Sequence, residues 1–151
     1  MLAVQESNGP LKGLGIWKLP TGLADAKEDI DAAAKREVLE ETGIESDFVG
    51  IFSFQQAHNS LFGKSDMFFV CLLTPTTFDI KKQESEIFAC EWIDVESYLN
   101  QEFFLKSPLL SKMNEVVAGI VRDRTREIYM KKHELSSRLR PGVIALYTLT
   151  A

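Results

Sequence analysis

The stretch from Gly22 to Ile44 constrains the fold more than any other part of this chain. It joins a loop containing Gly22 to a helix that is predicted from about Asp29 to Thr42 and is rich in Ala, Glu and Lys. Gly43 follows at the position where helices commonly end in a left-handed residue, a conformation that glycine adopts without steric cost. The sequence therefore predicts one charged helix that is entered from a loop and closed by a glycine.

Three glutamates of this helix are the candidates for chemistry. Glu37, Glu40 and Glu41 stand at positions i, i+3 and i+4, so they share one face of the helix. Like charges at this spacing repel and weaken a helix by roughly 0.2–0.5 kcal/mol per pair. A hard divalent cation such as Mg²⁺, which prefers oxygen ligands, would offset this repulsion. An exposed acidic face without a metal is the alternative that these three residues alone leave open.

The complete spacing of the stretch is more specific than its glutamates. Gly22 is followed by Glu28 and then by the run from Arg36 to Ile44. This string resembles the Nudix signature, G-x5-E-x7-R-E-U-x-E-E-x-G-U with U apolar, and matches it at every constrained position. At average residue frequencies the match arises by chance in fewer than about one window in a million. The family usually has Gly where Thr21 stands, which is a mild departure.

The resemblance implies a metal site on this helix. Glu37, Glu40 and Glu41 would be metal ligands, and Gly22 would offer its backbone carbonyl to a metal. Mg²⁺ would be the cofactor, with Mn²⁺ as an alternative ion. The implied reaction is hydrolysis of a diphosphate bond, in which an activated water attacks one phosphorus in line with its leaving group.

Further roles are implied outside the metal ligands. Glu28 and Arg36 would form an ion pair that braces the loop rather than act as catalysts. Many relatives bring a distal glutamate to the metal, and Glu86 is the candidate here, with Glu84 in reserve. For each of these two residues, a solvated loop acid is the alternative. Glu40 or Glu86 would accept the proton from the attacking water, and the sequence does not choose between them.

The remaining pattern predicts the fold class. Strand-like runs rich in β-branched and aromatic residues cover 2–5, 15–19, 47–56, 67–73, 89–94 and 143–149. A short helix is predicted at 95–100, and a longer one begins at Ser107, with Pro108 in its first turn. Because strands and helices mix without regular alternation, we expect an α/β domain with a mixed sheet sandwiched between helices, as in the Nudix fold. By the resemblance, the chain starts after the family's first strand.

Length and charge fit one domain. With 151 residues and 45% hydrophobic content the chain is long enough for a single core. We expect a Nudix domain at 1–125 and a C-terminal tail of uncertain order at 126–151. The net charge of −5 gives no general attraction to nucleic acid or to an anionic membrane. From Arg122 onward, seven basic and three acidic residues give +4, which fits a solvated tail or a partner contact. The apolar stripe of the helix that begins at Ser107 fits either core packing or a homodimer contact.

The sequence also predicts a cytoplasmic protein. Cys71 and Cys90 lie in apolar runs and resemble small buried hydrophobes rather than a disulfide framework. The longest apolar run, 67–73, is too short to span a bilayer, and the N-terminus lacks a signal-peptide pattern. His58 and Lys64 lie between two predicted strands where family members often contact substrate. A surface or packing histidine is the favoured reading of His58, and we expect Lys64 to be a plain surface lysine.

The substrate is expected to be a nucleoside diphosphate linked to another moiety. Across residues 2 to about 104 the pattern is similar to plant cytosolic Nudix proteins and to an animal relative. This similarity implies ADP-ribose, NADH or both as substrates. One alternative is a catalytically weak nucleotide-binding or truncated regulatory form, and a second is an enzyme that removes the cap of messenger RNA. The latter would bind RNA through the basic tail, with a steep dependence on salt.

Overall fold

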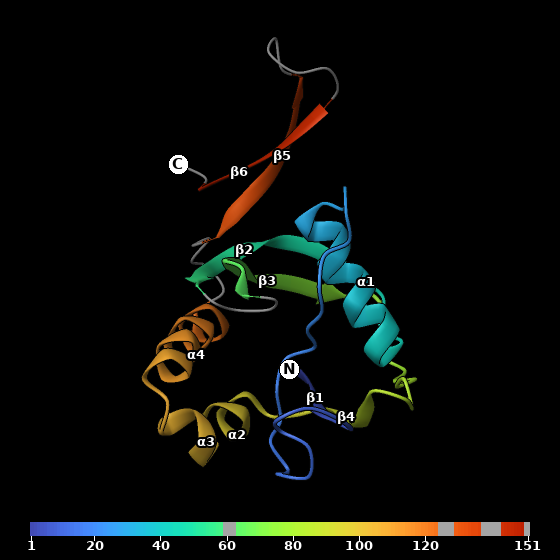
Figure 1. Ribbon diagram of the computed structural model, residues 1–151, viewed down its shortest axis with the longest axis vertical. Helices are drawn as coiled ribbons and strands as arrows, with labels where there is room; N and C mark the ends of the chain where they lie inside the picture. Colours follow the sequence, from blue (N-terminus) through green and yellow to red (C-terminus); the bar gives the residue numbers. More distant parts are fainter. Residues whose placement is uncertain (59–62, 124–128, 137–142, 150–151) are drawn as a thin grey trace.

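The structure, a computed structural model, describes residues 1–58, 63–123, 129–136 and 143–149 (Figure 1). Its described strands form two sheets in which every pairing between strands is antiparallel. The smaller sheet pairs β1 (Leu2–Glu6) with β4 (Ile87–Trp92). The larger has the order β3-β2-β5-β6 and consists of β3 (Asp66–Pro75), β2 (Ser46–Ala57), β5 (Met130–Ser136) and β6 (Val143–Leu149).

Helices lie on both sides of the β2–β3 pair (Figure 1). The helices are α1 (Ile30–Thr42), α2 (Val95–Leu99), α3 (Glu102–Leu105) and α4 (Pro108–Arg122). In Figure 1, α1 lies on one side of the pair and α4 on the other. The expected α/β class, with helices on both sides of a sheet, is therefore confirmed, while the described strand pairings are antiparallel where a mixed sheet was expected. None of the helices in the described part of the chain is long and apolar enough to cross a membrane.

The C-terminal end of α1 is fixed by a glycine. Gly43 has φ 73°, in the left-handed region, and its N–H donates to the carbonyl of Leu39 at 2.8 Å. A Cβ at this position would lie 2.7 Å from the Cβ of Lys81, so neither the conformation nor the space admits a side chain. Thr42, which is fully buried, accepts from the Lys81 N–H at 2.8 Å through its carbonyl. This end of the helix is thus tied to the segment that leads to β4.

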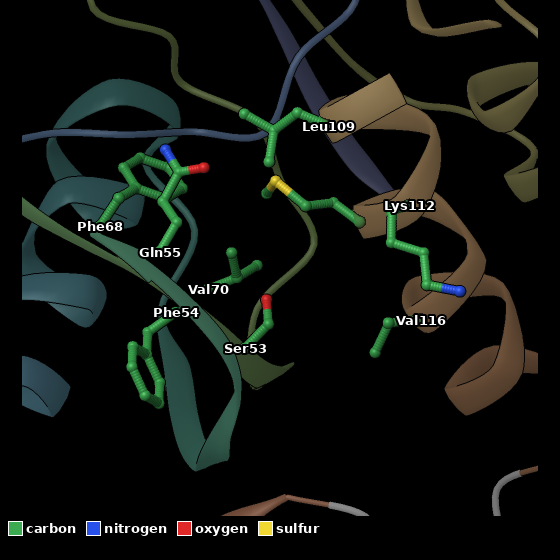
Figure 2. A pocket seen from close by; sticks show the side chains of 9 residues that line it. Ser53, Phe54, Gln55, Phe68, Val70, Leu109, Lys112 and Val116 are labelled. Atoms are coloured by element: carbon green, nitrogen blue, oxygen red, sulfur yellow. The ribbon is translucent and has the colours of Figure 1, made fainter. Parts of the chain in front are cut away.

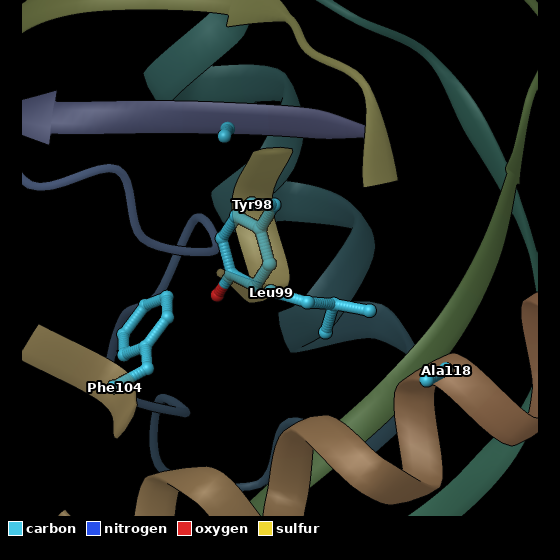
Figure 3. Packing of buried hydrophobic residues seen from close by; sticks show 5 residues of the cluster. Tyr98, Leu99, Phe104 and Ala118 are labelled. Atoms are coloured by element: carbon cyan, nitrogen blue, oxygen red, sulfur yellow. The ribbon is translucent and has the colours of Figure 1, made fainter. Parts of the chain in front are cut away.

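The main core cluster joins β1 to the helices that follow β4. Ala3 of β1 belongs to one buried cluster with Tyr98, Leu99, Phe104 and Ala118, and Figure 3 shows the side chains of this cluster. The rings of Tyr98 and Phe104 are 5.1 Å apart between centroids. Ser107 caps α4 as predicted, because its side chain accepts from the Leu110 N–H. The chain therefore builds this core from segments far apart in the sequence.

The predicted strand at 15–19 is wrong. Only Lys18 in this segment makes a strand-like bridge, which is to Val4. Gly15 has φ 67°, which interrupts extended backbone, and the side chain of Gln101 binds both the N–H and the carbonyl of Trp17. The segment is thus held by a side chain where a strand would need a neighbouring backbone.

The last two strands form a hairpin that extends away from the body (Figure 1). The sequence predicts β6 at 143–149, where the structure has it, but gives no indication of β5. The hairpin meets the rest of its sheet at one register pair, Ile51 with Met130. Gly50 accommodates this approach, since a Cβ there would lie 2.5 Å from the ring of Tyr129. The hairpin therefore needs contacts beyond the sheet to hold its position.

Candidate functional site

Arg36 of α1 is the centre of a network of ion pairs. Its Nε and Nη2 lie 2.9 Å from the two carboxylate oxygens of Glu28, and Nη1 lies 2.8 Å from Glu37 and 3.1 Å from Glu40. Nη2 also donates to the carbonyl of Leu23 at 2.9 Å. The hydrogen bonds with Arg36 and with a backbone N–H lower the pKa of Glu28 to about 2. This planar fork joins the loop before the helix to the helix itself.

The loop backbone at Gly22 packs directly against Glu37. A Cβ built on Gly22 would lie 1.8 Å from the carboxyl carbon of Glu37 and 2.1 Å from each of its oxygens. No side chain fits at position 22 without displacing this carboxylate. The requirement for glycine here is one of space, and it brings a backbone segment and a predicted ligand together.

Glu41 is the buried acid of the site, with 6% of its surface exposed. Its carboxylate accepts a hydrogen bond from the Thr21 N–H at 3.3 Å. Burial raises the pKa of Glu41 to about 7, although Lys18 and the Thr21 N–H favour the charged form. The negative charges of Glu37 and Glu86 raise this pKa further. The carboxylate of Glu41 thus lies in a dry, acidic environment where a cation would stabilise its charge.

Lys18 is a neighbour of the site that sequence reasoning missed. Its ammonium donates to Thr21 Oγ1 at 2.7 Å and to the carboxylate of Glu6. Thr21, the residue that departs from the usual family pattern, is therefore held by its hydroxyl as well as by its backbone contact with Glu41. The available signal was a lysine four residues before Gly22. Its contacts tie the loop at Thr21 to β1.

The two candidates in the loop before β4 differ in their surroundings. Glu86 is exposed, and its charge acts on Glu41. Glu84 is 83% exposed at its side chain and is paired with Lys82 at 2.5 Å. The charge of Glu86 therefore acts on the buried acid, whereas Glu84 is paired with a lysine.

The donor chemistry of this site fits a hard divalent cation, but the side chains are not closed around one. In the described ranges, no group of three or more His, Cys, Asp or Glu residues is arranged to hold a metal ion. Glu37 and Glu40 both accept from Arg36, while Glu41 accepts from Thr21. The terminal torsion of a glutamate is soft, so these carboxylates can turn without a change of backbone. A buried carboxylate with further acids nearby suits Mg²⁺.

A small apolar cavity lies between the β2–β3 pair and α4 (Figure 2). Its volume is about 200 Å³. The apolar part of its lining includes Phe68, Val70, Leu109, Met113 and Val116. The lining also includes Ser53 and Gln55, whose Oγ and Oε1 atoms are buried and have no hydrogen-bond partner among the described residues. Apolar walls with a few polar groups are found in ligand pockets, although this cavity is smaller than the roughly 300–1,000 Å³ of a pocket for a whole drug-sized ligand.

The other residues that the sequence singles out lie in ordinary environments. His58 Nδ1 is 2.8 Å from Ser65 Oγ on an exposed surface, and Lys64 is exposed. Burial raises the pKa of both Cys71 and Cys90 to about 11, so neither thiol ionises near neutral pH. Cys90 is buried and Cys71 is partly so, which fits the expected packing role. Of the residues that the sequence singles out, those with unusual surroundings are therefore the acids of α1 and its loop.

The sequence is similar to known proteins over most of its length. The family description "NUDIX domain" matches residues 1–113. Nudix hydrolase 2 of Arabidopsis thaliana is 47% identical over 119 residues, which cover 79% of this chain and 43% of that protein. Nucleoside diphosphate-linked moiety X motif 6 of Xenopus laevis is 46% identical over 98 residues, which cover 64% of this chain and 44% of that protein. The chain spans less than half the length of the curated relatives it matches.

Solved structures of distant relatives share the fold. An Ap4A hydrolase of C. elegans, solved as a binary complex, has a TM-score of 0.60 at 19% identity, and the match covers 80% of this chain and 85% of that one. The MutT protein from Methanosarcina mazei Go1 has a TM-score of 0.59 at 23% identity, covering 83% and 85%. At such low identity these likenesses support the fold alone.

Proposed function

The chain belongs to the Nudix family, and on this premise we propose that it is a Mg²⁺-dependent hydrolase that cleaves the diphosphate bond of a nucleoside diphosphate linked to another group. The observation that carries the proposal is Glu41, a buried carboxylate whose charge has no ion-pair partner at hydrogen-bond distance in the described structure. Glu37 and Glu86 add negative charge to its surroundings. Such a group of acids is destabilising by itself and becomes favourable once a cation is bound.

The residues of α1 and its loop would hold the ion. We assign Glu37, Glu40 and Glu41 as ligands, together with the backbone carbonyl of Gly22. Mg²⁺, when bound, would offset charge on the diphosphate oxygens and lower the pKa of a water. The close packing of Gly22 on Glu37 supports this assignment, because it places loop backbone beside a carboxylate.

The chain's other acids would position the loop and take up the proton. Glu28 and Arg36 hold the loop against the helix through two hydrogen bonds of 2.9 Å. Glu40 is 53% exposed at its side chain, and Glu86 is exposed as well, so either can exchange a proton with solvent after accepting it from water. Both remain candidates for the general base.

The cavity between the sheet and α4 would take the base of the substrate. Its volume of about 200 Å³ suits one ring system rather than a whole dinucleotide. The unused acceptors of Ser53 and Gln55 would accept hydrogen bonds from an amino group such as that of adenine. With the sequence similarity to the plant members, this supports ADP-ribose and NADH as the substrates to test first.

A hydrolysis screen tests the proposal. The full chain would be incubated with Mg²⁺ and ADP-ribose, NADH, coenzyme A, a dinucleoside polyphosphate or capped RNA, and AMP or other phosphate esters would be measured. We expect cleavage of ADP-ribose or NADH that is abolished by EDTA and by Glu41→Gln. The control is Glu45→Gln, an exposed acid just beyond α1. If folded protein cleaves none of these substrates, a nucleotide-binding or regulatory role replaces the enzyme, and cleavage of capped RNA alone would indicate decapping.

A further inference from the structure

The C-terminal hairpin lies beyond the part of the chain that matches the family description, yet it contacts the helix that carries the signature. The match ends at residue 113, and the hairpin comprises β5 and β6. Lys132 of β5 lies 2.8 Å from Asp31 Oδ1 and 2.9 Å from Asp29 Oδ2. Asp29 is the N-cap of α1, and Asp31 lies in its first turn. A residue about a hundred positions away in the sequence therefore forms ion pairs with the start of α1, the helix that carries the signature.

The second strand of the hairpin reaches the same aspartate. The Tyr147 hydroxyl of β6 donates to Asp31 Oδ1 at 3.3 Å. The ring of Tyr147 packs edge-on against Phe48 of β2, with 6.3 Å between centroids. Asp31 thus receives hydrogen bonds from both strands of the hairpin, and the tyrosine is itself fixed by the sheet.

These contacts are partly shielded from water. The side chains of Lys132 and Asp31 are each 16% exposed. Burial alone would raise the pKa of Asp31, but the hydrogen bonds and charge of Lys132 outweigh it, and the pKa lies below its ordinary value. Glu134, at 3.2 Å, gives Lys132 a third carboxylate. Shielded pairs with several partners constrain geometry better than exposed pairs between two flexible side chains.

The contacts of Lys132 and Tyr147 with Asp31 lie on the same helix as the proposed metal ligands. Glu37 follows Asp31 by six residues, which is about 9 Å along a helix. The far end of α1 is already fixed at Gly43 and Thr42 by the segment that leads to β4. A helix held at both ends has a defined tilt and rotation, and these determine where Glu37, Glu40 and Glu41 point.

We propose that Lys132 and Tyr147 are positioning residues for the metal centre, and that they act through Asp31 by fixing the start of α1. The inference rests on the proposed function, because it concerns the ligands of that same site. A hairpin that only stabilised the fold would affect the melting temperature of the metal-free protein and leave its affinity for metal unchanged.

Metal affinity of the folded full chain separates the two roles. Mn²⁺ binding would be measured by electron paramagnetic resonance at a temperature where circular dichroism shows each variant folded. We expect Lys132→Met to weaken Mn²⁺ affinity about tenfold, the lower range for residues that support metal ligands. Lys132→Arg, which keeps the charge and the donors, should bind within about twofold of the unaltered chain, and Tyr147→Phe should show a smaller loss than Lys132→Met. The control is Lys106→Met, a 74% exposed lysine paired with Glu102.

The outcomes distinguish this inference from the function on which it rests. If the unaltered chain binds no Mn²⁺, the proposed function falls, and this inference with it. If the unaltered chain binds Mn²⁺ and folded Lys132→Met and Tyr147→Phe bind it equally well, the inference alone is overturned. Should Lys132→Met fail to fold, Tyr147→Phe decides, since it removes only one hydroxyl.

Discussion

The two ends of α1 hold their acids in opposite ways. At the start, Asp31 is paired with Lys132 and Tyr147, and its pKa lies below the ordinary value. Near the end, Glu41 is buried with one backbone donor at 3.3 Å, and burial raises its pKa to about 7. The paired acid at the start is already stabilised by this chain's own cation. Among the described residues no cation lies at ion-pair distance from the buried acid near the end, so this is the acid that a metal ion would stabilise.

In the middle of the helix, two acids are both paired with a cation of this chain and proposed as metal ligands. Glu37 and Glu40 share the guanidinium of Arg36, which also holds Glu28. Arg36 is therefore both a brace for the loop and a counter-charge for two proposed ligands. Because the acids along α1 differ in their partners, we expect substitutions along the helix and its loop to change hydrolysis and stability by different amounts.

The largest effect is expected where the loop meets Glu37. In Gly22→Ala the new Cβ would overlap the Glu37 carboxylate at 1.8 Å, so the loop or the ligand must move. An ångström of misplacement can cost about a hundredfold in rate, and we expect at least that loss in Mg²⁺-dependent hydrolysis. Steady-state kinetics measure it, with Gly119→Ala as control, since this glycine lies within α4 and its Cβ would meet nothing within 4 Å. Hydrolysis of Gly22→Ala at the wild-type rate would show that Glu37 is not a ligand.

A somewhat smaller effect is expected at the brace. Arg36→Lys keeps the charge but loses the planar fork that binds Glu28, Glu37 and Glu40 together. We expect hydrolysis to fall by roughly ten- to a hundredfold, the range for residues that orient metal ligands. Lys35→Arg, at the exposed neighbouring position, is the control for the exchange. An unchanged rate would mean that charge alone, rather than geometry, is required at position 36.

The loop before β4 offers a matched pair of acids. Glu86→Gln removes a charge that acts on Glu41, whereas Glu84→Gln removes one that is paired with Lys82 at the surface. We expect Glu86→Gln to lower kcat by about tenfold, less than the roughly hundredfold loss of a sole general base, because Glu40 remains as a second candidate. Glu84→Gln should stay within about twofold of the unaltered enzyme. Equal effects of the two variants would remove Glu86 from the site.

The smallest effect concerns acid stability. The folded chain holds the pKa of Glu28 at about 2, below its ordinary value of 4.5. A lowered pKa means that the ion pair stabilises the fold above pH 4.5, and that this contribution is lost as the pH falls toward 2. The melting temperature of Glu28→Gln should therefore lie below that of the unaltered chain at neutral pH, and the two should converge in acid. A constant difference across this range would show that the pair does not contribute through its charge.

The sequence predicts the helix and its local contacts better than the contacts between distant segments. The start and end of α1 follow from the repeat of Ala, Glu and Lys and from Gly43, because capping and periodicity are local. The ion pair of Glu28 and Arg36, which the family resemblance implies, joins residues eight positions apart. The contact of Lys132 with Asp31 spans 101 positions, and no periodicity relates the two residues. Local sequence patterns and the family resemblance therefore predict the segment from Gly22 to Ile44, but they do not predict the hairpin that contacts it.

The cavity and the segment at 15–19 show the same limit. Ser53 and Gln55 stand two positions apart on β2, but the sequence does not show that residues of α4 line the same cavity or that these two oxygens lack partners in the described part of the chain. The segment at 15–19 has a strand-like composition, yet Gln101 takes the backbone groups of Trp17. In each case the local structure depends on a residue or helix that is distant in the sequence: Gln101 for the segment at 15–19, and α4 for the cavity.

The most direct test of the central claim is the melting temperature of the unaltered chain and of Glu41→Gln, with and without Mg²⁺. We predict that Mg²⁺ at about a hundred times its dissociation constant adds roughly 2.7 kcal/mol to the unaltered chain, which raises its melting temperature by roughly 5–10 °C. Glu41→Gln should melt no lower than the unaltered chain without metal, because it removes a buried charge, and should lose the response to Mg²⁺. An equal response to Mg²⁺ in the two proteins would contradict the assignment of Glu41 as the acid that binds the metal.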